Sequence, residues 1–433
     1  MSSKGIADRV AIVAMGCTSF GEYWGRSADD LLVDAITDCF DGNDRVSLAD
    51  VDAFWLGTLG SGQSGLTLSK PLALDYKPVT RVENYCASGS ESFRNACYAV
   101  ASGAYDKVMA VGVEKLKDSG FSGLLRGDPP GDGTAAELSM TAPAAFSLLD
   151  PAYCARYGVD PEQMRSAMTH IAWKNHANGA LNPKAQYRSE VSREKIENAP
   201  LVAGRLGVFD CSGVSDGAAC ALIVRAEDAH LYTDTPMYVK ALALAAGPAR
   251  GATDPDYDYT TFPEVVRSAQ DAYAQAGITD PRTQISMAEV HDCFTPTELV
   301  LMEDLGFASR GQGWKDVLAG DFDRSGRLPV NPDGGLKSFG HPVGASGLRM
   351  LYECWLQFRG LAGARQLDDP HTALTHNLGG RPGSCVSFVS VVGRELGCCA
   401  SKCLPYLFGA LTSRDRVPHF WVSLDGHTLF YLY

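Results

Sequence analysis

The sequence predicts an α/β fold built from two similar halves. Short apolar runs of strand length alternate with longer segments whose apolar residues recur at helical spacing, and this alternation indicates a mostly parallel sheet covered by helices on both faces. The chain has 433 residues, of which 45% are hydrophobic and 21% charged, which is enough to bury a large core in two or three domains. Both halves show the same order of strand, helix, strand ending at a reactive residue, and helix.

The first half supplies four of the predicted strands. Buried or strand-like segments lie at 10–15, 51–59, 78–85 and 107–114. Amphipathic helices are predicted at 27–40 and 88–103, and a loop rich in Gly and Ser joins the second and third strands. The segment 119–204 has helical patches and little strand character, so we expect an excursion that lies over the first domain.

The second half repeats the pattern after a return strand within 208–226. Strands are predicted at 237–245 and 287–292, with another ending at Val392, and helices at 262–277, 297–306 and 345–359. These segments predict an N-terminal domain over 1–118 and 205–230, an inserted domain over 119–204, a C-terminal domain over 231–396 and an atypical tail over 397–433. The tail has no clear period, and a partner-binding extension, a membrane-touching extension and a non-native read-through all stay open for it.

Composition argues against several classes of function. The net charge is −13, from 38 basic and 51 acidic residues, and such a surface repels nucleic acid. Thirteen cysteines are scattered without Cys-x-x-Cys spacing, which indicates a reducing compartment and no zinc site. No window of about 20 apolar residues predicts a membrane span, and Met1–Arg9 is too polar for a secretory signal. We therefore expect a cytoplasmic protein.

The first candidate for chemistry is Cys86, in Asn84-Tyr85-Cys86-Ala87-Ser88-Gly89. It ends a predicted strand and precedes a helix of small residues, so its thiol lies at a helix N-terminus. A helix end contributes about 0.3–1 kcal/mol, less than the roughly 1.4 kcal/mol of one pKa unit. A free thiol has a pKa of about 8.5 and is mostly protonated at neutral pH, so a nucleophilic Cys86 needs a base. The alternative is that Cys86 is a buried structural cysteine.

Two segments place histidines where a base is needed. His341 lies in the turn Gly340-His341-Pro342-Val343-Gly344, which opens a predicted helix, and no Gly-Lys-Ser/Thr follows that would indicate a phosphate loop. His291-Asp292-Cys293-Phe294 follows a predicted strand, at the strand end where α/β folds place ligand sites. A metal site at this second segment lacks visible partner ligands, so we predict no metal.

The fourth segment, Asn377-Leu378-Gly379-Gly380-Arg381-Pro382-Gly383, is a glycine-rich turn. Its backbone amides are suited to donate hydrogen bonds to a negatively charged oxygen. A plain turn between two strands is the alternative.

Together these segments resemble the thiolase superfamily, over nearly the whole chain to about residue 396. The resemblance rests on Cys86-Ala87-Ser88-Gly89, Ser215-Asp216-Gly217-Ala218-Ala219, His291-Asp292-Cys293-Phe294 and Gly340-His341-Pro342-Val343-Gly344-Ala345-Ser346-Gly347. The His-Asp-Cys-Phe block resembles the sterol-carrier-protein-type thiolases; the best-known thiolases have Asn-Glu-Ala-Phe there. The resemblance implies the thiolase fold: two similar α/β domains, each with a five-stranded mixed sheet, in a layered α-β-α-β-α arrangement with an inserted loop domain that helps to bind coenzyme A.

The resemblance also implies an activity, thiolysis of a 3-ketoacyl-CoA or the reverse Claisen condensation. Cys86, deprotonated by His341, would become acylated, and the backbone amides of Cys86 and Gly379 would stabilise the oxyanion. His341 and His291 would contribute to a second oxyanion hole for the enolate of acetyl-CoA.

The chain departs from the best-known thiolases at Asn377-Leu378-Gly379, where those enzymes have a catalytic cysteine in Cys-x-Gly. Asparagine cannot carry a proton at neutral pH. Cys293 is the expected replacement, since this subfamily has a cysteine there. Cys385 is a poorer candidate, because we expect it to point from a strand into the core.

By the same resemblance we expect no cofactor besides the coenzyme A thioester substrate, a homodimer or tetramer, and a place in lipid and fatty acid metabolism. Some bacterial and archaeal relatives work with a small zinc-ribbon and OB-fold partner subunit. A related condensing, decarboxylating or retro-aldol enzyme and a non-catalytic acyl-CoA-binding subunit are the alternatives, although the aldolase relatives lack the nucleophilic cysteine. In a eukaryotic cell, peroxisome or mitochondrion would replace the cytoplasm.

Overall fold

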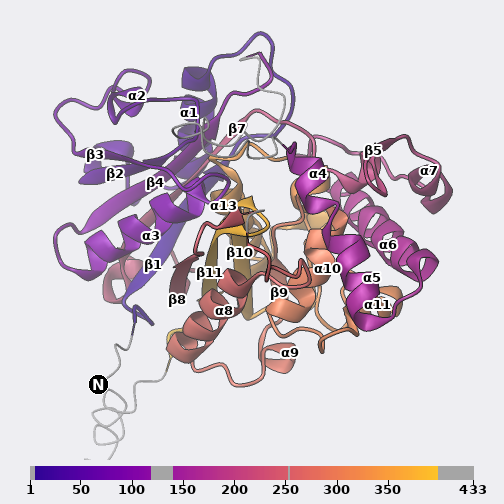
Figure 1. Cartoon of the computed structure of the whole chain (residues 1–433). Coiled ribbons are helices and arrows are strands. Elements are labelled where there is room, and N and C mark those ends of the chain that lie inside the picture. Colours follow the sequence, from indigo (N-terminus) through magenta and orange to yellow (C-terminus); the bar gives the residue numbers. More distant parts are fainter. Residues whose placement is uncertain (1–4, 119–139, 252–253, 398–433) are drawn as a thin grey trace, which may run out of the picture. The chain divides into compact units, whose positions relative to one another are not determined.

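A computed structural model describes residues 5–118, 140–251 and 254–397 of the chain (Figure 1). The expectations for 119–139, and for the tail beyond residue 397, lie outside the described residues. The described strands form one nine-stranded mixed sheet and one two-stranded sheet. No helix formed by the described residues is long and apolar enough to cross a lipid bilayer.

Five strands make up the first half of the large sheet. Their order is β3 (Val79–Val82), β2 (Ala53–Gly57), β4 (Lys107–Glu114), β7 (Gly217–Arg225) and β1 (Val10–Cys17). β2 pairs in parallel with β3 and β4, whereas β7 pairs antiparallel with β4 and β1. Helix α1 (Ala28–Phe40), which starts at a capping box between Ser27 and Asp30, contacts β1 and β7, and α3 (Ser88–Ala101) contacts β2 and β4.

Four strands continue the sheet into the second half, in the order β8 (Met237–Ala246), β11 (Ser384–Gly393), β10 (Thr372–Arg381) and β9 (Met287–Glu289). The parallel β9–β10 pair is followed by antiparallel pairs from β10 to β11 and from β11 to β8. Two residue pairs join β1 to β8. The fifth strand implied for this half is reduced to a single bridge between Ala288 and Val330.

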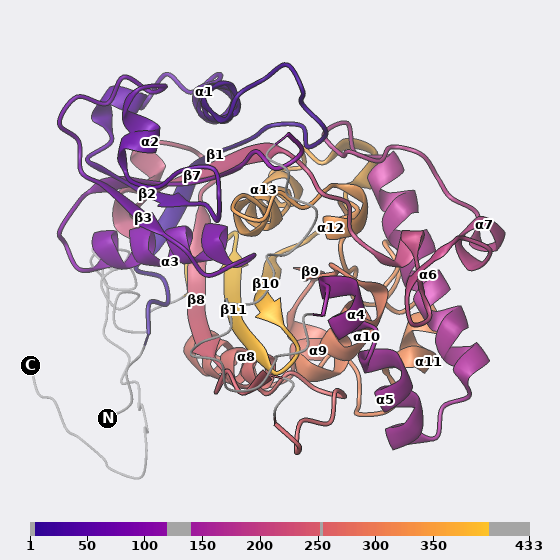
Figure 2. The ribbon, with the colours of Figure 1, turned by 45° about the horizontal axis from the view of Figure 1, so that its top comes forward.

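The layered arrangement implied by the family resemblance is confirmed. Helix α8 (Pro263–Ala276) contacts β8 and β11, whereas α13 (Ser346–Phe358) contacts β10, β1 and β7. α3 and α13 touch each other, so they form the middle layer between the two halves of the sheet (Figure 2). Separate apolar cores lie on the α1 side, around the α3–α13 pair and on the α8 side.

The described part of the excursion is helical, as predicted. The prediction that it lies over the first domain is wrong, because its longest helix packs against the second half of the molecule. Its helices are α4 (Ala142–Phe146), α5 (Leu149–Tyr157), α6 (Pro161–Ala180) and α7 (Arg193–Glu197), joined to the hairpin β5 (Leu201–Ala203) and β6 (Leu206–Gly207). α6 packs against α10 (Thr295–Asp304), α11 (Gly313–Leu318) and α12 (Gly335–Ser338), all in the second half (Figure 2). Buried Lys174 fixes this contact, because its ammonium binds Glu298 and the Val330 carbonyl.

Four short helices were not predicted: α2 (Leu66–Ser69), α9 (Pro281–Gln284), α11 and α12. They are 4 to 6 residues long, too short for a helical period to be read in the sequence. The predicted strand at 208–226 begins with a 3₁₀ turn at Val208–Asp210 and becomes a strand only at Gly217.

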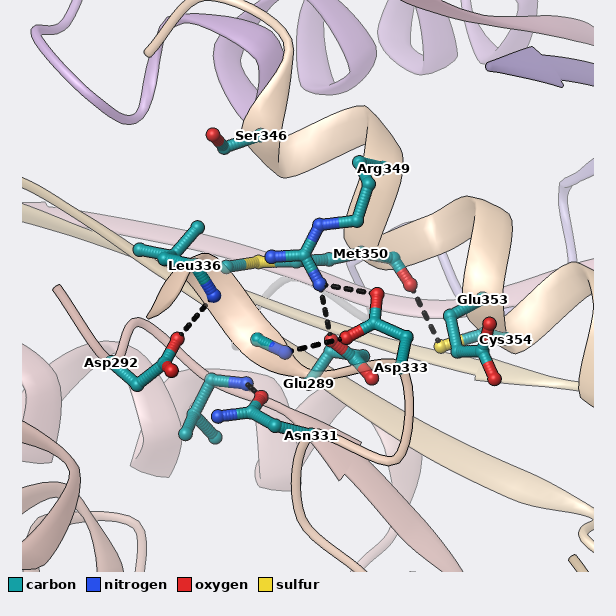
Figure 3. A network of polar contacts seen from close by, with 12 residues as sticks. Glu289, Asp292, Asn331, Asp333, Leu336, Ser346, Arg349, Met350, Glu353 and Cys354 are labelled. Atoms are coloured by element: carbon teal, nitrogen blue, oxygen red, sulfur yellow. Dashed lines mark hydrogen bonds and ion pairs between the residues drawn. The ribbon is translucent and has the colours of Figure 1, made fainter. Parts of the chain in front are cut away.

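A buried ion network attaches α13 to the second half of the sheet (Figure 3). The Arg349 guanidinium on α13 contacts Glu289 at 2.6 Å and Asp333 at 2.5 Å, and all three side chains are fully buried. One cation faces two carboxyl groups, and burial, together with the neighbouring Asp333, raises the pKa of Glu289 well above its usual value. The network fixes the start of α13, which directly follows the His341 turn.

We expect Arg349→Met to lower the free energy of unfolding by about 3–5 kcal/mol, because it leaves two buried carboxyl groups without their cation. Urea denaturation at pH 7.5 measures this change. Arg267→Met is the matched control: Arg267 forms an exposed pair with Asp271, so its removal should cost less than about 1 kcal/mol. Equal losses in the two variants would contradict a structural role for the network.

Candidate active site

Cys86 lies at the sharp turn between β3 and α3. Tyr85 has a left-handed backbone with φ of +51°, and Cys86 follows it just before the first turn of α3. The first turn of α3 also comes very close to the His341 turn: a Cβ at Gly89 would lie 2.6 Å from the Gly344 carbonyl oxygen. Only glycine permits this approach, which brings together the two segments predicted to carry the nucleophile and its base.

A cavity of about 150 Å³ opens at Cys86. All four predicted catalytic side chains line it: Cys86, His291, Cys293 and His341. The Sγ of Cys86 and one ring nitrogen from each histidine lie within 4.8 Å of one another. Residues 86, 291 and 341 thus come from three separate parts of the chain to one point between the halves.

The orientation of His341 is set by its hydrogen bonds. Its Nδ1 lies 2.8 Å from the Ser346 hydroxyl, which itself donates to the Pro342 carbonyl. Because that hydroxyl proton is used, Nδ1 carries the hydrogen and Nε2 has the free lone pair. Nε2 is buried and has no hydrogen-bond partner among the described residues, as a base awaiting a proton requires. The Ser215 hydroxyl accepts the His341 backbone N–H, which gives the Ser215-Asp216-Gly217 motif a structural role.

His291 is held in the same tautomer by Asn377. The Asn377 amide nitrogen donates to the Cys86 carbonyl at 2.9 Å and lies 3.2 Å from the Ser90 hydroxyl, so its oxygen must face the other way. That oxygen lies 2.9 Å from His291 Nδ1 and accepts its hydrogen. Nε2 of His291 is therefore left with a lone pair. Asn377 therefore links the Cys86 backbone to the ring of His291.

Burial favours the uncharged forms of Cys86, His291 and His341. Burial and, to a smaller extent, the Glu114 carboxylate raise the pKa of Cys86 to about 12. Burial lowers the pKa of His291 to about 4 and that of His341 well below its usual value. A thiol and neutral imidazoles are thus the resting forms, so a thiolate at Cys86 would need a neighbouring base to take its proton.

Glu114, which the sequence analysis missed, fixes the floor of the site. The buried carboxylate ends β4 and accepts hydrogen bonds from the Thr58 hydroxyl and from the backbone N–H of Leu59, Gly60 and Gly344. It therefore ties the loop after β2 to the His341 turn. The sequence did contain a signal for Glu114: it is a single acidic residue at the end of a predicted apolar strand.

The structure separates the two cysteines considered as proton carriers. Cys293 lines the cavity, and its Sγ lies 3.9 Å from the Thr297 hydroxyl. Burial raises the pKa of Cys293 well above its usual value. Cys385 belongs to the apolar core on the α8 side, as Cys293 does, but it does not line the cavity. Gly379 also does not line the cavity, but its Cα packs so closely on the Cys86 loop that a Cβ would lie 2.2 Å from the Asn84 carbonyl oxygen.

His376 is a fully buried histidine next to Asn377, and neither of its ring nitrogens forms a hydrogen bond within the described residues. Burial lowers the pKa of His376 well below its usual value. We expect His376→Leu to raise the free energy of unfolding by about 1–3 kcal/mol, because it removes an unsatisfied buried polar group.

The gain from His376→Leu should grow as the pH falls below about 6.5. The unfolded histidine then takes up a proton that the folded one refuses, and the wild type loses about 1.4 kcal/mol per pH unit through this residue. Urea titrations at pH 7.5 and 5.5 measure both effects. The exposed His371 just before the same strand offers the control His371→Leu, for which no such gain is expected; a gain independent of pH would contradict the argument.

Comparison with known families agrees with this geometry. A family model described as thiolase, N-terminal domain, matches residues 10–227. A second model, described as thiolase C-terminal domain-like, matches residues 252–391. Together the two models span both halves of the sheet.

Two relatives match this chain over nearly the same length. The acetyl-CoA acetyltransferase of Methanothermobacter thermautotrophicus is 37% identical over 387 residues, which cover 87% of this chain and 97% of that protein. Sterol carrier protein 2 of Homo sapiens is 30% identical over 395 residues, covering 86% of this chain and 70% of that protein.

Solved structures show the same fold. The Ltp2-ChsH2(DUF35) aldolase superposes with a TM-score of 0.77 at 24% identity, covering 90% of this chain and 100% of that one. Human mitochondrial 3-ketoacyl-CoA thiolase superposes with a TM-score of 0.64 at 18% identity, covering 89% and 99%. From the two family models, the relatives and the fold, we conclude that the chain belongs to the thiolase family.

Proposed function

We propose that the chain is an acyl-CoA C-acyltransferase, which cleaves a 3-ketoacyl-CoA with coenzyme A or runs the reverse condensation. The observation that carries this proposal is the meeting of the Cys86 thiol with the ring nitrogens of His291 and His341 within 4.8 Å at the cavity. The acetyl-CoA acetyltransferase named among the relatives supports the substrate class.

In the cleavage direction, the Cys86 thiol gives its proton to Nε2 of His341 and the sulfur attacks the 3-keto carbon. The backbone amide of Cys86 stabilises the resulting oxyanion, as a fixed donor in a dry site does. The bond between the second and third carbons then breaks, and its electron pair moves onto the acetyl-CoA enolate. The acyl group stays on Cys86, and His341 keeps the thiol proton.

Cys293 completes the reaction as the proton carrier. Its thiol protonates the enolate carbon to give acetyl-CoA. The resulting thiolate takes the proton of incoming coenzyme A, whose sulfur attacks the acyl-enzyme. Cys86 leaves, and His341 returns its proton. Every proton is thus accounted for by Cys86, Cys293 and His341, while Asn377 only holds the geometry.

The histidine tautomers decide how the enolate oxygen is stabilised. While the acyl group is on Cys86, His341 is protonated at both nitrogens and donates from Nε2. His291 donates its Nδ1 hydrogen to Asn377, so its Nε2 can only accept. We propose that one water molecule donates one hydrogen to His291 Nε2 and its other hydrogen to the enolate oxygen. Burial holds the pKa of His291 near 4, so the imidazole stays neutral and can accept.

Assembly belongs to the same proposal. β3 is an edge strand of the described sheet, and Leu66 and Tyr76 near it are largely exposed, so this edge is open to a second copy in a homodimer. The Ltp2-ChsH2(DUF35) aldolase is named as an assembly of two proteins. A small zinc-ribbon and OB-fold partner is the equivalent candidate here. We propose a coenzyme A thioester as substrate, with no further cofactor and a place in fatty acid metabolism.

Thiolysis assays test the proposed activity. Acetoacetyl-CoA and a longer 3-ketoacyl-CoA are mixed with free coenzyme A, and the loss of the 3-keto enolate absorbance is followed. Cleavage of either compound supports the proposal, and the preferred compound gives the chain length. If neither is cleaved but Cys86 is still acylated by acetyl-CoA, the alternatives to test next are decarboxylating condensation and retro-aldol cleavage.

A further inference from the structure

We propose that Cys86, His291 and His341 form a binding site for one thiophilic divalent cation such as Zn²⁺, which reversibly blocks acylation. One sulfur and two imidazole nitrogens are donors that Zn²⁺ prefers, and three protein ligands with an open fourth position are typical of accessible zinc sites. Sequence spacing gave no sign of this set, because its members lie at positions 86, 291 and 341.

The distances suit a site that closes around the ion. The three donor atoms lie within 4.8 Å of one another. Tetrahedral coordination at about 2.3 Å to sulfur and 2.0–2.1 Å to nitrogen brings donors to roughly 3.3–3.6 Å apart. The donors therefore have to move together by at most about 1.2–1.5 Å, which is within the reach of small side-chain rotations. The donors face a cavity, which leaves the fourth position to water or another small ligand.

The hydrogen bonds around the site hold both imidazoles ready for a metal. A metal-bound histidine normally donates its other N–H to a protein oxygen, which fixes the tautomer. Asn377 does this for His291, and Ser346 does it for His341. Both Nε2 lone pairs are therefore free, and that of His341 is buried without any partner among the described residues.

Ion binding releases the Cys86 proton as the Zn–S bond forms. A Cys86 sulfur bonded to the ion cannot attack an acyl group. Metal and acyl-CoA should therefore compete for the same free enzyme, and a chelator should restore activity.

Cobalt(II), which replaces zinc and is coloured, tests the site without any assay of activity. The wild-type chain, free of coenzyme A, is titrated with Co²⁺ alone. We expect one equivalent to give the sulfur-to-cobalt charge-transfer band together with the visible bands of tetrahedral Co²⁺, and Zn²⁺ to bleach both. Cys86→Ser should lose the charge-transfer band, and His291→Asn should weaken binding by about tenfold or more.

The cavity offers a matched control. Cys211 also lines it but is not one of the three ligands, so Cys211→Ser should keep the full spectrum. A second measurement uses only the wild type: Zn²⁺ should slow the alkylation of Cys86 by iodoacetamide, and EDTA should restore it. Absence of the charge-transfer band in the wild type, its survival in Cys86→Ser, or unprotected alkylation would each overturn the metal site. Acylation of the metal-free enzyme by acetyl-CoA tests the proposed function separately.

Discussion

Cys86→Ala is expected to abolish the acyl-enzyme and to reduce thiolysis by about 10⁴–10⁶-fold, the loss seen when a covalent nucleophile is removed. No other described cysteine shares its position, where the thiol meets the lone pair of His341 and the first turn of α3. Incubation with acetyl-CoA labelled in the acetyl group, followed by mass spectrometry of the intact chain, measures the acylation directly.

Cys211→Ala is the control for this experiment, because Cys211 lines the same cavity but has no part in the proposed steps. We expect it to retain the acyl label and most of the activity. If the Cys86→Ala chain were still labelled within the cavity, another residue would be the nucleophile and the proposed mechanism would be wrong.

The second large effect is expected for Cys293→Ala. Coenzyme A leaves from acetyl-CoA as a stable thiolate, so acylation of Cys86 by acetyl-CoA needs no proton from Cys293 and should persist. Carbon–carbon bond cleavage does need that proton, and its loss should lower turnover of acetoacetyl-CoA by about 10²–10⁴-fold. Labelling and steady-state thiolysis, measured on one preparation, separate the two steps.

Cys385→Ala provides the comparison for Cys293→Ala, because Cys385 is buried in the same core on the α8 side but does not line the cavity. Its replacement should change stability more than it changes the ratio of acylation to turnover. Normal thiolysis by Cys293→Ala would mean that a different group carries the proton. The next candidate would be Nε2 of His291.

The local part of this structure could be predicted, because it depends on short-range patterns. The limits of β4 agree with the expected segment, and those of α1, α3, α8 and α13 agree to within about two residues. The spacing of apolar residues that predicts a strand or a helix can be read from neighbouring positions in the sequence. Cys86, His291 and His341 were singled out because they follow strands or open helices, and Cys293 because of the family resemblance. All four line the cavity.

The long-range part could not be predicted in the same way. Strand–helix alternation indicates parallel strands, but it does not show that β7, far along the chain, pairs antiparallel with both β4 and β1. The placement of α6 depends on the buried ion pair between Lys174 and Glu298. The spacing of apolar residues in the sequence does not predict such a long-range pair. The tautomers of the two histidines depend on single hydrogen bonds to Asn377 and Ser346, and only the folded arrangement defines them.

The bond from the Asn377 amide to the Cys86 carbonyl spans 291 positions of the sequence, and this has a consequence for biosynthesis. The nucleophile emerges early from the ribosome, whereas the histidines and the asparagine that complete its surroundings are made in the last third of the chain. A truncated product that ends before residue 377 would carry the cysteine without Asn377 and without β11, and one that ends before residue 291 would lack both histidines as well. Acyl transfer should therefore be switched on late, as a property of the finished polypeptide rather than of either half alone.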